Sequence, residues 1–387
     1  MDIIESVNSQ VNEKKESNII SITNGEYYAD FCMADKIQPK SQPWFWPGII
    51  PLHTCTLFAG QGGIGKSQLL LYLAAATSTG KEFQAAGSIH QLPQGKVIVL
   101  SGEDDPEYQL TPKLIALGAD LSQIAVIKTM AVPGKRKRLL DIDAHLSLLI
   151  NVIKELGNVK LIIIDPIHYF TGAMRDYISS EVSEFISNLS DMAKENDLAV
   201  IMNKHTRKRN GGDSIASAVD EVAGSGAWVN SVRQSWIMHP HPEDEGKVLL
   251  MNLKVNIAKK SGKAMAYQIN SCEIPNPNGD GAIATTTMEW FPEMEDITAD
   301  EALSMPVANG TEQNIAKFVI DFLKTKPDGM YSSPDVLTAA IEKGEFKRAT
   351  YYKVRERMIK QGVIEQVPNH YNKDSFMLRL IDHKSYT

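Results

Sequence analysis

The sequence predicts an α/β domain built on a mostly parallel sheet, followed by a smaller domain of helices and a β-hairpin. The chain has 387 residues, which is enough for two or three domains. Between residues 54 and 291, short continuous apolar runs alternate with longer helical patterns, as is typical of strands buried on both faces of a sheet. Residues 311–387 instead carry three amphipathic helical patterns and then two short strand patterns.

The composition excludes several classes of protein. Hydrophobic residues make up 43% and charged residues 22% of the chain, which excludes a wholly disordered or fibrous protein. The net charge of -7 means that contact with nucleic acid must come from local basic patches. The sequence has no run of about 18 uncharged apolar residues and no cysteine spacing for disulfides or zinc, so we expect a cytoplasmic protein without a membrane partner.

Residues 1–45 are predicted to form an N-terminal arm. The polar residues 1–26 suit a flexible arm, a short helix that docks on a neighbour, or a disordered tail. Residues 43–52 are rich in proline and aromatic side chains, and we expect them to lie extended against an edge of the core, because proline donates no ladder hydrogen bond.

Residues 46–294 are predicted to form the α/β domain. Helices are expected at 66–80 and 143–156. Strands are expected at 55–59, 96–100, 159–165, 198–203, 235–239, 247–253 and 285–291.

The acidic residues 295–310 predict a linker, and residues 311–387 predict a second domain. Its helices are expected at 312–325, 333–344 and 348–362, with Ser332 or Ser333 capping the second, and its strands at 363–368 and 375–381. Three helices followed by a β-hairpin in this order predict a winged helix.

A phosphate-binding loop follows the first strand. Residues 60–67, GQGGIGKS, match G-x-x-x-x-G-K-[ST] between an apolar strand and a Leu/Ala-rich helix. Glycines let successive backbone N–H groups converge on phosphate oxygens, and the helix N-terminus adds its positive end. Lys66 is expected to reach the β- and γ-phosphates of ATP, and Ser67 to ligate Mg²⁺. The residues expected to contact the nucleotide here are Gly60, Gly62, Gly63, Gly65, Lys66, Ser67 and Gln68.

Asp165 supplies the carboxylate that such a loop requires on the metal side. It ends the apolar run 161–164 and would hold Mg²⁺ opposite Ser67. The alternative is an aspartate that caps the turn before Pro166.

Two further strands end in residues that suit hydrolysis. Glu103 follows the strand at 96–100 and would orient the attacking water. Asp104 and Asp105 are competing candidates, and a solvated acidic turn is the alternative. His205, at the tip of the strand at 198–203, would sense the γ-phosphate through a hydrogen bond.

These elements resemble RecA-type motor domains and, among them, the RepA-type hexameric replicative helicases of plasmids and other mobile elements, relatives of DnaB. The resemblance covers about residues 48–270 and rests on GQGGIGKS, SGEDDP, LIIIDPI, KHTRK, GSGAWVNSVR and LKVNIAKKSG. Two segments depart from the family pattern, around Trp228 and at 168–177.

The resemblance implies a RecA-like core that hydrolyses ATP between the subunits of a ring. Glu103 matches the residue that activates water, and His205 the one that couples the γ-phosphate to the DNA loops. Arg233 falls where the family has an arginine that reaches the neighbour's nucleotide, although the alternative is a surface arginine. Lys254 lies on a strand that in relatives also faces the adjacent subunit.

Two basic segments are predicted to contact DNA. Residues 204–209 carry four Lys/Arg, and the loop at this place lines the pore of RecA-type rings, where it would follow single-stranded DNA. The basic residues of 343–361 lie on and just before the third helix of the winged helix, which would contact duplex DNA or, alternatively, a protein such as an initiator. A third cluster, 134–138, is interpreted as a solubilising surface run. The DNA contacts are expected from Arg207, Lys208, Arg209, Lys347, Arg348, Lys353 and Arg355.

The sequence therefore predicts an ATP- and Mg²⁺-dependent hexameric DNA helicase that replicates a plasmid, phage or other mobile element. The alternative is a RecA-type ATPase without helicase activity that serves as a recombination mediator or a DNA-binding regulator.

Overall fold

The computed structural model divides the chain into two compact units, Met1–Pro43 and Trp44–Thr387. It describes residues 20–23, 28–127, 140–207, 217–222, 226–244, 246–258, 261–277, 279–305, 310–326, 329–342, 346–360, 362–369 and 376–381.

The first unit contains a small hairpin, which differs from the prediction for residues 1–26. β1 (Ile20–Thr23) pairs antiparallel with β2 (Tyr28–Phe31), and the 3₁₀ helix η1 (Ala34–Lys36) follows. Ile-Ser-Ile-Thr alternates as a strand does, but four residues are too few to stand out from the polar residues around them.

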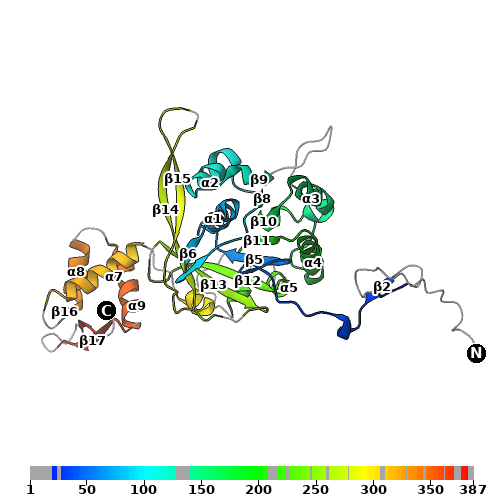
Figure 1. Cartoon of the computed structure of the whole chain (residues 1–387). Coiled ribbons are helices and arrows are strands. Elements are labelled where there is room, and N and C mark those ends of the chain that lie inside the picture. The colour runs from blue at the N-terminus through cyan, green and yellow to red at the C-terminus, as the bar shows by residue number, and fades with distance from the viewer. Residues whose placement is uncertain are drawn as a thin grey trace, which may run out of the picture. The chain divides into compact units, whose positions relative to one another are not determined.

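A mixed sheet organises the second unit (Figure 1). Within the described ranges it has nine strands, six of them parallel from β12 to β9 and three antiparallel from β13 to β15. The mostly parallel sheet is therefore confirmed, with an antiparallel extension. In spatial order the strands are β15 (Ala282–Trp290), β14 (Met265–Pro275), β13 (Lys247–Val255), β12 (Gln234–Pro240), β5 (Cys55–Gly60), β11 (Ala199–His205), β10 (Val159–Asp165), β8 (Lys96–Ser101) and β9 (Ile124–Ile127).

All seven strands expected for this domain are present in the sheet, whereas two further strands of the sheet, β9 and β14, were not predicted. β9 is a half-buried edge strand. The outer part of β14 is polar and only partly buried, so it lacks the continuous apolar run that marks a central strand.

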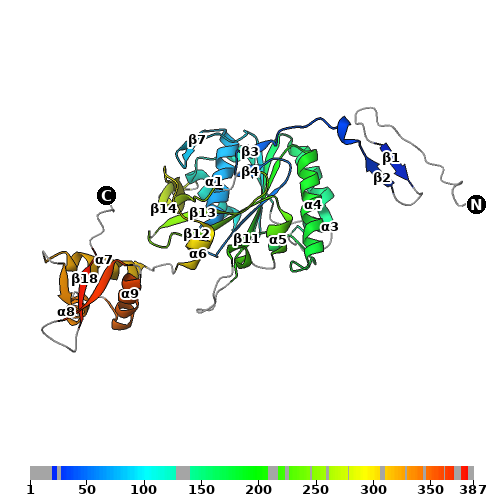
Figure 2. The ribbon, with the colours of Figure 1, turned by 90° about the horizontal axis from the view of Figure 1, so that it is seen from below.

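Helices cover both faces of the sheet, as Figures 1 and 2 show. One face packs against α3 (Ile142–Leu156), α4 (Ser179–Glu195), α5 (Ala227–Ser231) and α6 (Ala299–Ser304). The other packs against α1 (Lys66–Thr79) and α2 (Thr111–Ala116). Ile162 and Ile164 of β10 belong to the first apolar cluster, and Leu161 and Ile163 to the second, which explains the continuous apolar run.

Short elements connect these layers. They are the π-helix η2 (Pro106–Leu110), the 3₁₀ helices η3 (Leu121–Gln123), η4 (Ile167–Tyr169) and η5 (Ala218–Glu221), and the paired strands β6 (Phe83–Ala85) and β7 (Ser88–His90).

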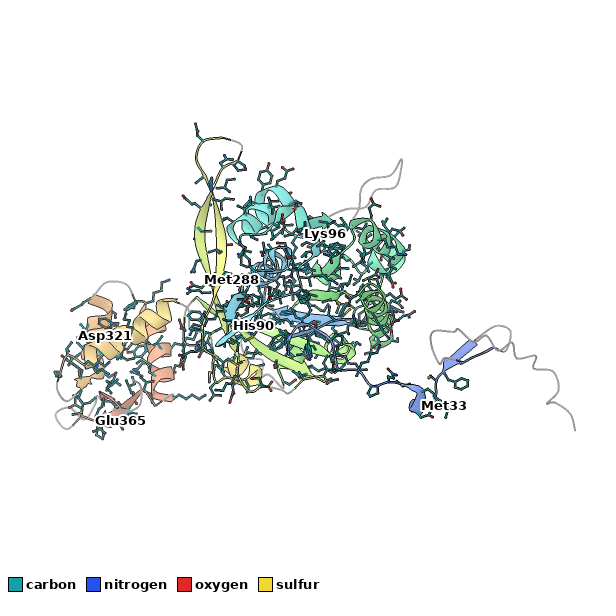
Figure 3. All side chains as sticks on the ribbon, in the orientation of Figure 1. Met33, His90, Lys96, Met288, Asp321 and Glu365 are labelled. Carbon is teal, nitrogen blue, oxygen red and sulfur yellow. The ribbon has the colours of Figure 1, made fainter. Side chains whose placement is uncertain are left out.

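The aromatic segment 43–52 packs on the second cluster, as predicted. It forms β3 (Trp44–Trp46) and β4 (Ile50–Pro51), and Trp46 is fully buried. The indole of Trp46 donates to His90 Nδ1 at 3.2 Å, and the Trp236 indole donates to the Ile49 carbonyl at 2.9 Å. Figure 3 shows how closely side chains crowd around the labelled His90 and Met288.

β14 and β15 form a long hairpin that projects from the core (Figure 1). Its base is buried through Tyr267 and Trp290, whereas fewer side chains surround its tip (Figure 3). The hairpin brings Ile269 over the phosphate loop. The two are so close that a Cβ atom on Gly65 would overlap the Ile269 side chain.

Part of the predicted linker 295–310 is instead a helix on the core. α6 begins with a capping box, in which Thr298 Oγ1 accepts from Glu301 N and the Glu301 carboxylate accepts from Thr298 N. Its buried residues include Ala302 and Leu303, and Asp300 Oδ1 accepts from Ala218 N at 2.7 Å. Small and acidic residues suggested a linker, but the alanines form the buried face of this helix.

The C-terminal part contains all three expected helices and both expected strands. The elements are α7 (Gly310–Leu323), β16 (Met330–Ser332), α8 (Ser333–Glu342), α9 (Arg348–Lys360), β17 (Ile364–Pro368) and β18 (Phe376–Leu380). β16 was not predicted and pairs with β18, giving the antiparallel order β16-β18-β17. Ser332 Oγ accepts from Asp335 N at 3.2 Å and so caps α8. Helices and strands share an apolar core that includes Val319, Val336 and Tyr351.

Among the described helices, none combines the length and the apolar character needed to cross a membrane.

Candidate nucleotide-binding site

The phosphate loop joins β5 to α1 at the centre of the parallel strands. Gly63 has φ 80° and Gly65 φ 91°, left-handed values that favour glycine. A Cβ atom on Gly60 would lie 2.8 Å from the Met238 carbonyl oxygen. The glycines are therefore required by backbone conformation and by close packing, and they leave the N-terminus of α1 facing the loop.

Lys66 is buried at the first position of α1. Its Nζ donates to the Gln61 carbonyl at 2.8 Å and lies 3.3 Å from His205 Nδ1. Burial lowers the pKa of Lys66 to about 8, although Asp165 and Glu103 oppose this by favouring the ammonium form. The amine thus lies among the groups that the sequence predicts for ATP hydrolysis.

Asp165 lies beside Ser67, as the metal-side prediction requires. The Ser67 hydroxyl and Asn203 Nδ2 both donate to its carboxylate. Burial of this carboxyl raises its pKa, and the two hydrogen bonds act in the opposite direction. Among the described residues, Asn203 Oδ1 is buried without a hydrogen-bond partner. Hydroxyl and carboxylate oxygens are the donors that Mg²⁺ prefers, so the residues present fit this ion.

The three acidic residues after β8 have different partners. The Asp105 carboxylate accepts from Glu107 N and Tyr108 N and caps η2. Asp104 forms a 2.8 Å ion pair with Lys113. Glu103 instead has its carboxylate 3.5 Å from His205 Nε2 and close enough to Lys66 to influence its pKa. Of the three candidates, Glu103 is the one that approaches both His205 and Lys66, whereas Asp104 lies near enough to Asp165 to raise the pKa of that carboxyl.

His205 lies between the phosphate loop and a second histidine that sequence reasoning missed. The His168 ring is 5.8 Å from the His205 ring and 4.3 Å from the Tyr169 ring. Partial burial, and then the proximity of His205 and Lys204, lower the pKa of His168. No sequence motif marks His168; its place three residues after Asp165 was the only available signal.

Gln68 is directed towards the β14–β15 hairpin. Its side-chain amide donates to the Thr286 carbonyl at 3.0 Å, and Thr286 Oγ1 donates back to Gln68 Oε1 at 2.9 Å. Thr286 also lines an open cavity of about 620 Å³ between η2, α2 and the hairpin. Gln68 therefore holds the hairpin against α1, a contact that the sequence prediction did not include.

Arg233 and Lys254 lie at the end of the strands opposite to the phosphate loop. Arg233 is exposed and immediately precedes β12, in which Met238 pairs with Gly60. Five residues at about 3.3 Å each place Arg233 roughly 16 Å along the sheet from the phosphate loop of its own chain. Lys254, which pairs with Ser235, donates to the Asn230 carbonyl at 2.5 Å. The structure places these two cations close to each other but not close to the phosphate loop of the same chain.

The basic segment 204–209 is split by the structure. Lys204 is buried and paired with Asp176, so it is not part of the exposed basic surface that the sequence predicted. Arg207 is exposed at the end of the described strand region. Lys208, Arg209 and the cluster 134–138 lie outside the described residues.

The basic helix α9 places two guanidinium groups near one aromatic ring. The Arg348 and Arg355 guanidinium groups lie 5.8 and 4.9 Å from the Tyr352 ring centroid, and Arg355 also donates to Ser333 Oγ at 3.1 Å. Lys347, Arg348 and Lys353 are exposed, whereas Arg355 is half-buried.

Comparison with known proteins agrees with this geometry. Residues 29–211 match the family model of an AAA domain. The matched range contains the phosphate loop, Glu103, Asp165 and His205. No curated protein matches the chain. The chain therefore carries a nucleotide-binding P-loop ATPase domain.

Binding of ATP should weaken at alkaline pH because of Lys66. The pKa of about 8 means that the amine loses its proton as pH rises through this value, and only the ammonium form attracts phosphate strongly. We expect the affinity for an ATP analogue with Mg²⁺ to be constant below about pH 7.5 and to fall by up to about tenfold per unit above about pH 8. Calorimetric titration across this range measures it. Lys66→Arg keeps its charge and should show no such dependence, whatever its absolute affinity; a flat profile for the native protein would contradict the assignment.

Proposed function

We propose that this chain is an ATP-dependent DNA helicase that works as a hexameric ring in the replication of a plasmid, phage or other mobile element. The observation that carries the proposal is the separation of Arg233 from the phosphate loop of its own chain. The ATPase domain and the resemblance to RepA-type helicases support the ring, and the resemblance alone supports the number of subunits and the mobile element.

The proposed hydrolysis uses residues from four neighbouring strands. Lys66 exchanges its contacts with Gln61 and His205 for the β- and γ-phosphates of ATP. Glu103 orients the attacking water and accepts its proton. His205, in contact with both groups, senses the γ-phosphate. Mg²⁺, which Ser67 and Asp165 would hold, supplies positive charge to the phosphate oxygens.

Arg233 completes the site of a neighbouring subunit in this proposal. At roughly 16 Å along the sheet from Gly60 it is beyond reach of its own nucleotide. A head-to-tail interface would bring this edge of one subunit to the phosphate loop of the next, with Lys254 beside it. An arginine supplied in trans stabilises transition-state charge, and it makes hydrolysis depend on assembly.

DNA is proposed to contact two regions. Arg207 begins the basic segment that would follow the backbone of single-stranded DNA in the pore. The order α7–β16–α8–α9–β17–β18 supports a winged-helix domain, in which α9 would be the recognition helix for duplex DNA. Contact with an initiator protein is the alternative for this domain.

Single-stranded DNA should stimulate the ATPase, and the protein should displace a strand from a forked duplex. Translocation couples hydrolysis to DNA, so we expect stimulation of at least about tenfold, or ~1.4 kcal/mol. Steady-state hydrolysis and a strand-displacement assay measure the two activities, with Lys66→Ala as the inactive control. Hydrolysis without stimulation or displacement would instead indicate a RecA-type ATPase that serves as a recombination mediator or regulator.

Two inactive variants should restore hydrolysis when mixed. The Arg233→Ala subunit keeps an intact phosphate loop, and the Lys66→Ala subunit keeps its Arg233. Where the phosphate loop of the first faces the arginine of the second, the site contains both groups. In randomly mixed rings about a quarter of the sites are complete, so we expect about a quarter of the native rate. Each variant alone should be inactive, and Arg233→Ala should still bind ATP. Absence of recovery after exchange of subunits would reject the arrangement in trans.

Replacing exposed lysines of the C-terminal domain should weaken binding to duplex DNA. For Lys347→Ala combined with Lys353→Ala, we expect a lower affinity for duplex DNA. We also expect the slope of the logarithm of the binding constant against the logarithm of the salt concentration to be shallower by about one to two units. Fluorescence anisotropy at several salt concentrations measures both quantities. Glu356→Ala on the same helix is the matched control and should not weaken binding. Unchanged affinity in the double variant would favour a protein partner for this domain.

A further inference from the structure

The tip of β11 carries side chains on both faces of the sheet. His205 contacts Lys66 and Glu103, and Asn203 donates to Asp165, so these two residues face the nucleotide site. Lys204 lies between them and points to the opposite face, because successive side chains alternate along a strand. The residue between the two site residues therefore reaches the layer that contains α4 and α5.

Lys204 is one of the few buried cations of the described core. Its side chain is 3% exposed, and its Nζ lies 3.1 Å from Asp176 Oδ2 and 4.6 Å from the centroid of the Trp228 ring. The Trp228 indole in turn donates to the Asp176 carbonyl at 3.2 Å. Removing an ammonium from water is costly, so these partners must compensate for it. The three residues form a closed set of contacts, here named the Lys204 cluster.

The Lys204 cluster connects directly to the segment that carries Arg233. Trp228 is fully buried in α5, which ends at Ser231, two residues before Arg233. Beyond α5, the Arg233 carbonyl accepts from Asn256 N at 3.1 Å. The position of Arg233 is therefore set by α5 on one side and, on the other, by the residue that follows β13.

We propose that Lys204 is a positioning residue for ATP hydrolysis, which holds α5, and through it Arg233, in register with the strand tip that carries His205. This inference rests on the proposed role of Arg233 at the neighbour's nucleotide. Lys66 must release His205 when it binds phosphate. Lys204 immediately precedes His205 on the same strand, so a movement of His205 would act directly on Lys204. The Lys204 cluster thus links the nucleotide site of one subunit to the arginine that this subunit offers to the next.

Mixed rings test this role. Lys204→Met retains the length and apolar stem of the side chain but loses its charge, and we expect kcat to fall at least tenfold with KM for ATP changed less than threefold. The variant keeps its own phosphate loop, so mixing it with Lys66→Ala should restore hydrolysis, as for Arg233→Ala. If Lys204 acted only on its own nucleotide, the mixture would remain inactive. Unchanged kcat in Lys204→Met, or no recovery in the mixture, overturns the proposal.

Three further measurements keep the outcomes distinct. Lys160→Met removes another lysine–aspartate pair, with Asp197 at 2.9 Å, and should retain native kcat. Asp176→Asn removes the ion pair from the other side and should repeat the result if Lys204→Met does not fold. The mixture of Arg233→Ala with Lys66→Ala is run in parallel. If that mixture does not recover hydrolysis, the arrangement in trans is overturned. If it recovers hydrolysis but the mixture of Lys204→Met with Lys66→Ala does not, only the proposed role of Lys204 is overturned.

Discussion

The nucleotide site depends on the register of four parallel strands. His205 at the end of β11 pairs with Gly60 of β5, and Asp165 of β10 pairs with Ser101 of β8. Parallel strands end at the same edge of a sheet, so this register gathers the polar residues around Lys66. A slip of one residue would turn each of these side chains to the other face. The apolar clusters on both faces, which fix the register, therefore also fix the geometry of the site.

Much of the fold and several site residues could be predicted because their signals are local. Continuous apolar runs indicated the central strands, and the glycine pattern indicated the loop that buries Lys66. The partners of these residues could not be predicted, because the spatial order of strands is not written in the sequence. Asn203 beside Asp165 and His168 beside His205 are contacts of this kind. The helix α6 was missed for a different reason, since its buried face consists mainly of alanines.

The tip of β11 also shows why a run of basic residues is ambiguous in a sequence. Lys204 and Arg207 belong to one charged run, yet Lys204 is buried beside Trp228 and Arg207 is exposed. Side chains alternate between the two faces along β11, and this directs Lys204 into the protein. Arg207 lies beyond the end of the strand, where the alternation no longer applies. Burial lowers the pKa of Lys204, and Asp176 opposes this shift by favouring the ammonium form. Charge counting alone would assign both residues to the same DNA-binding surface.

The helix α6 limits how far the C-terminal domain can travel. Because α6 ends at Ser304 and α7 begins at Gly310, only five residues separate two folded elements. Even fully extended, this connection spans about 20 Å, whereas a free segment over 295–310 would span about 55 Å. A short tether raises the effective concentration of one domain near the other, to about the millimolar range. Under the proposed function, DNA bound by the C-terminal domain would thus be held near the ATPase domain at high local concentration, even where the affinity of the C-terminal domain itself is weak.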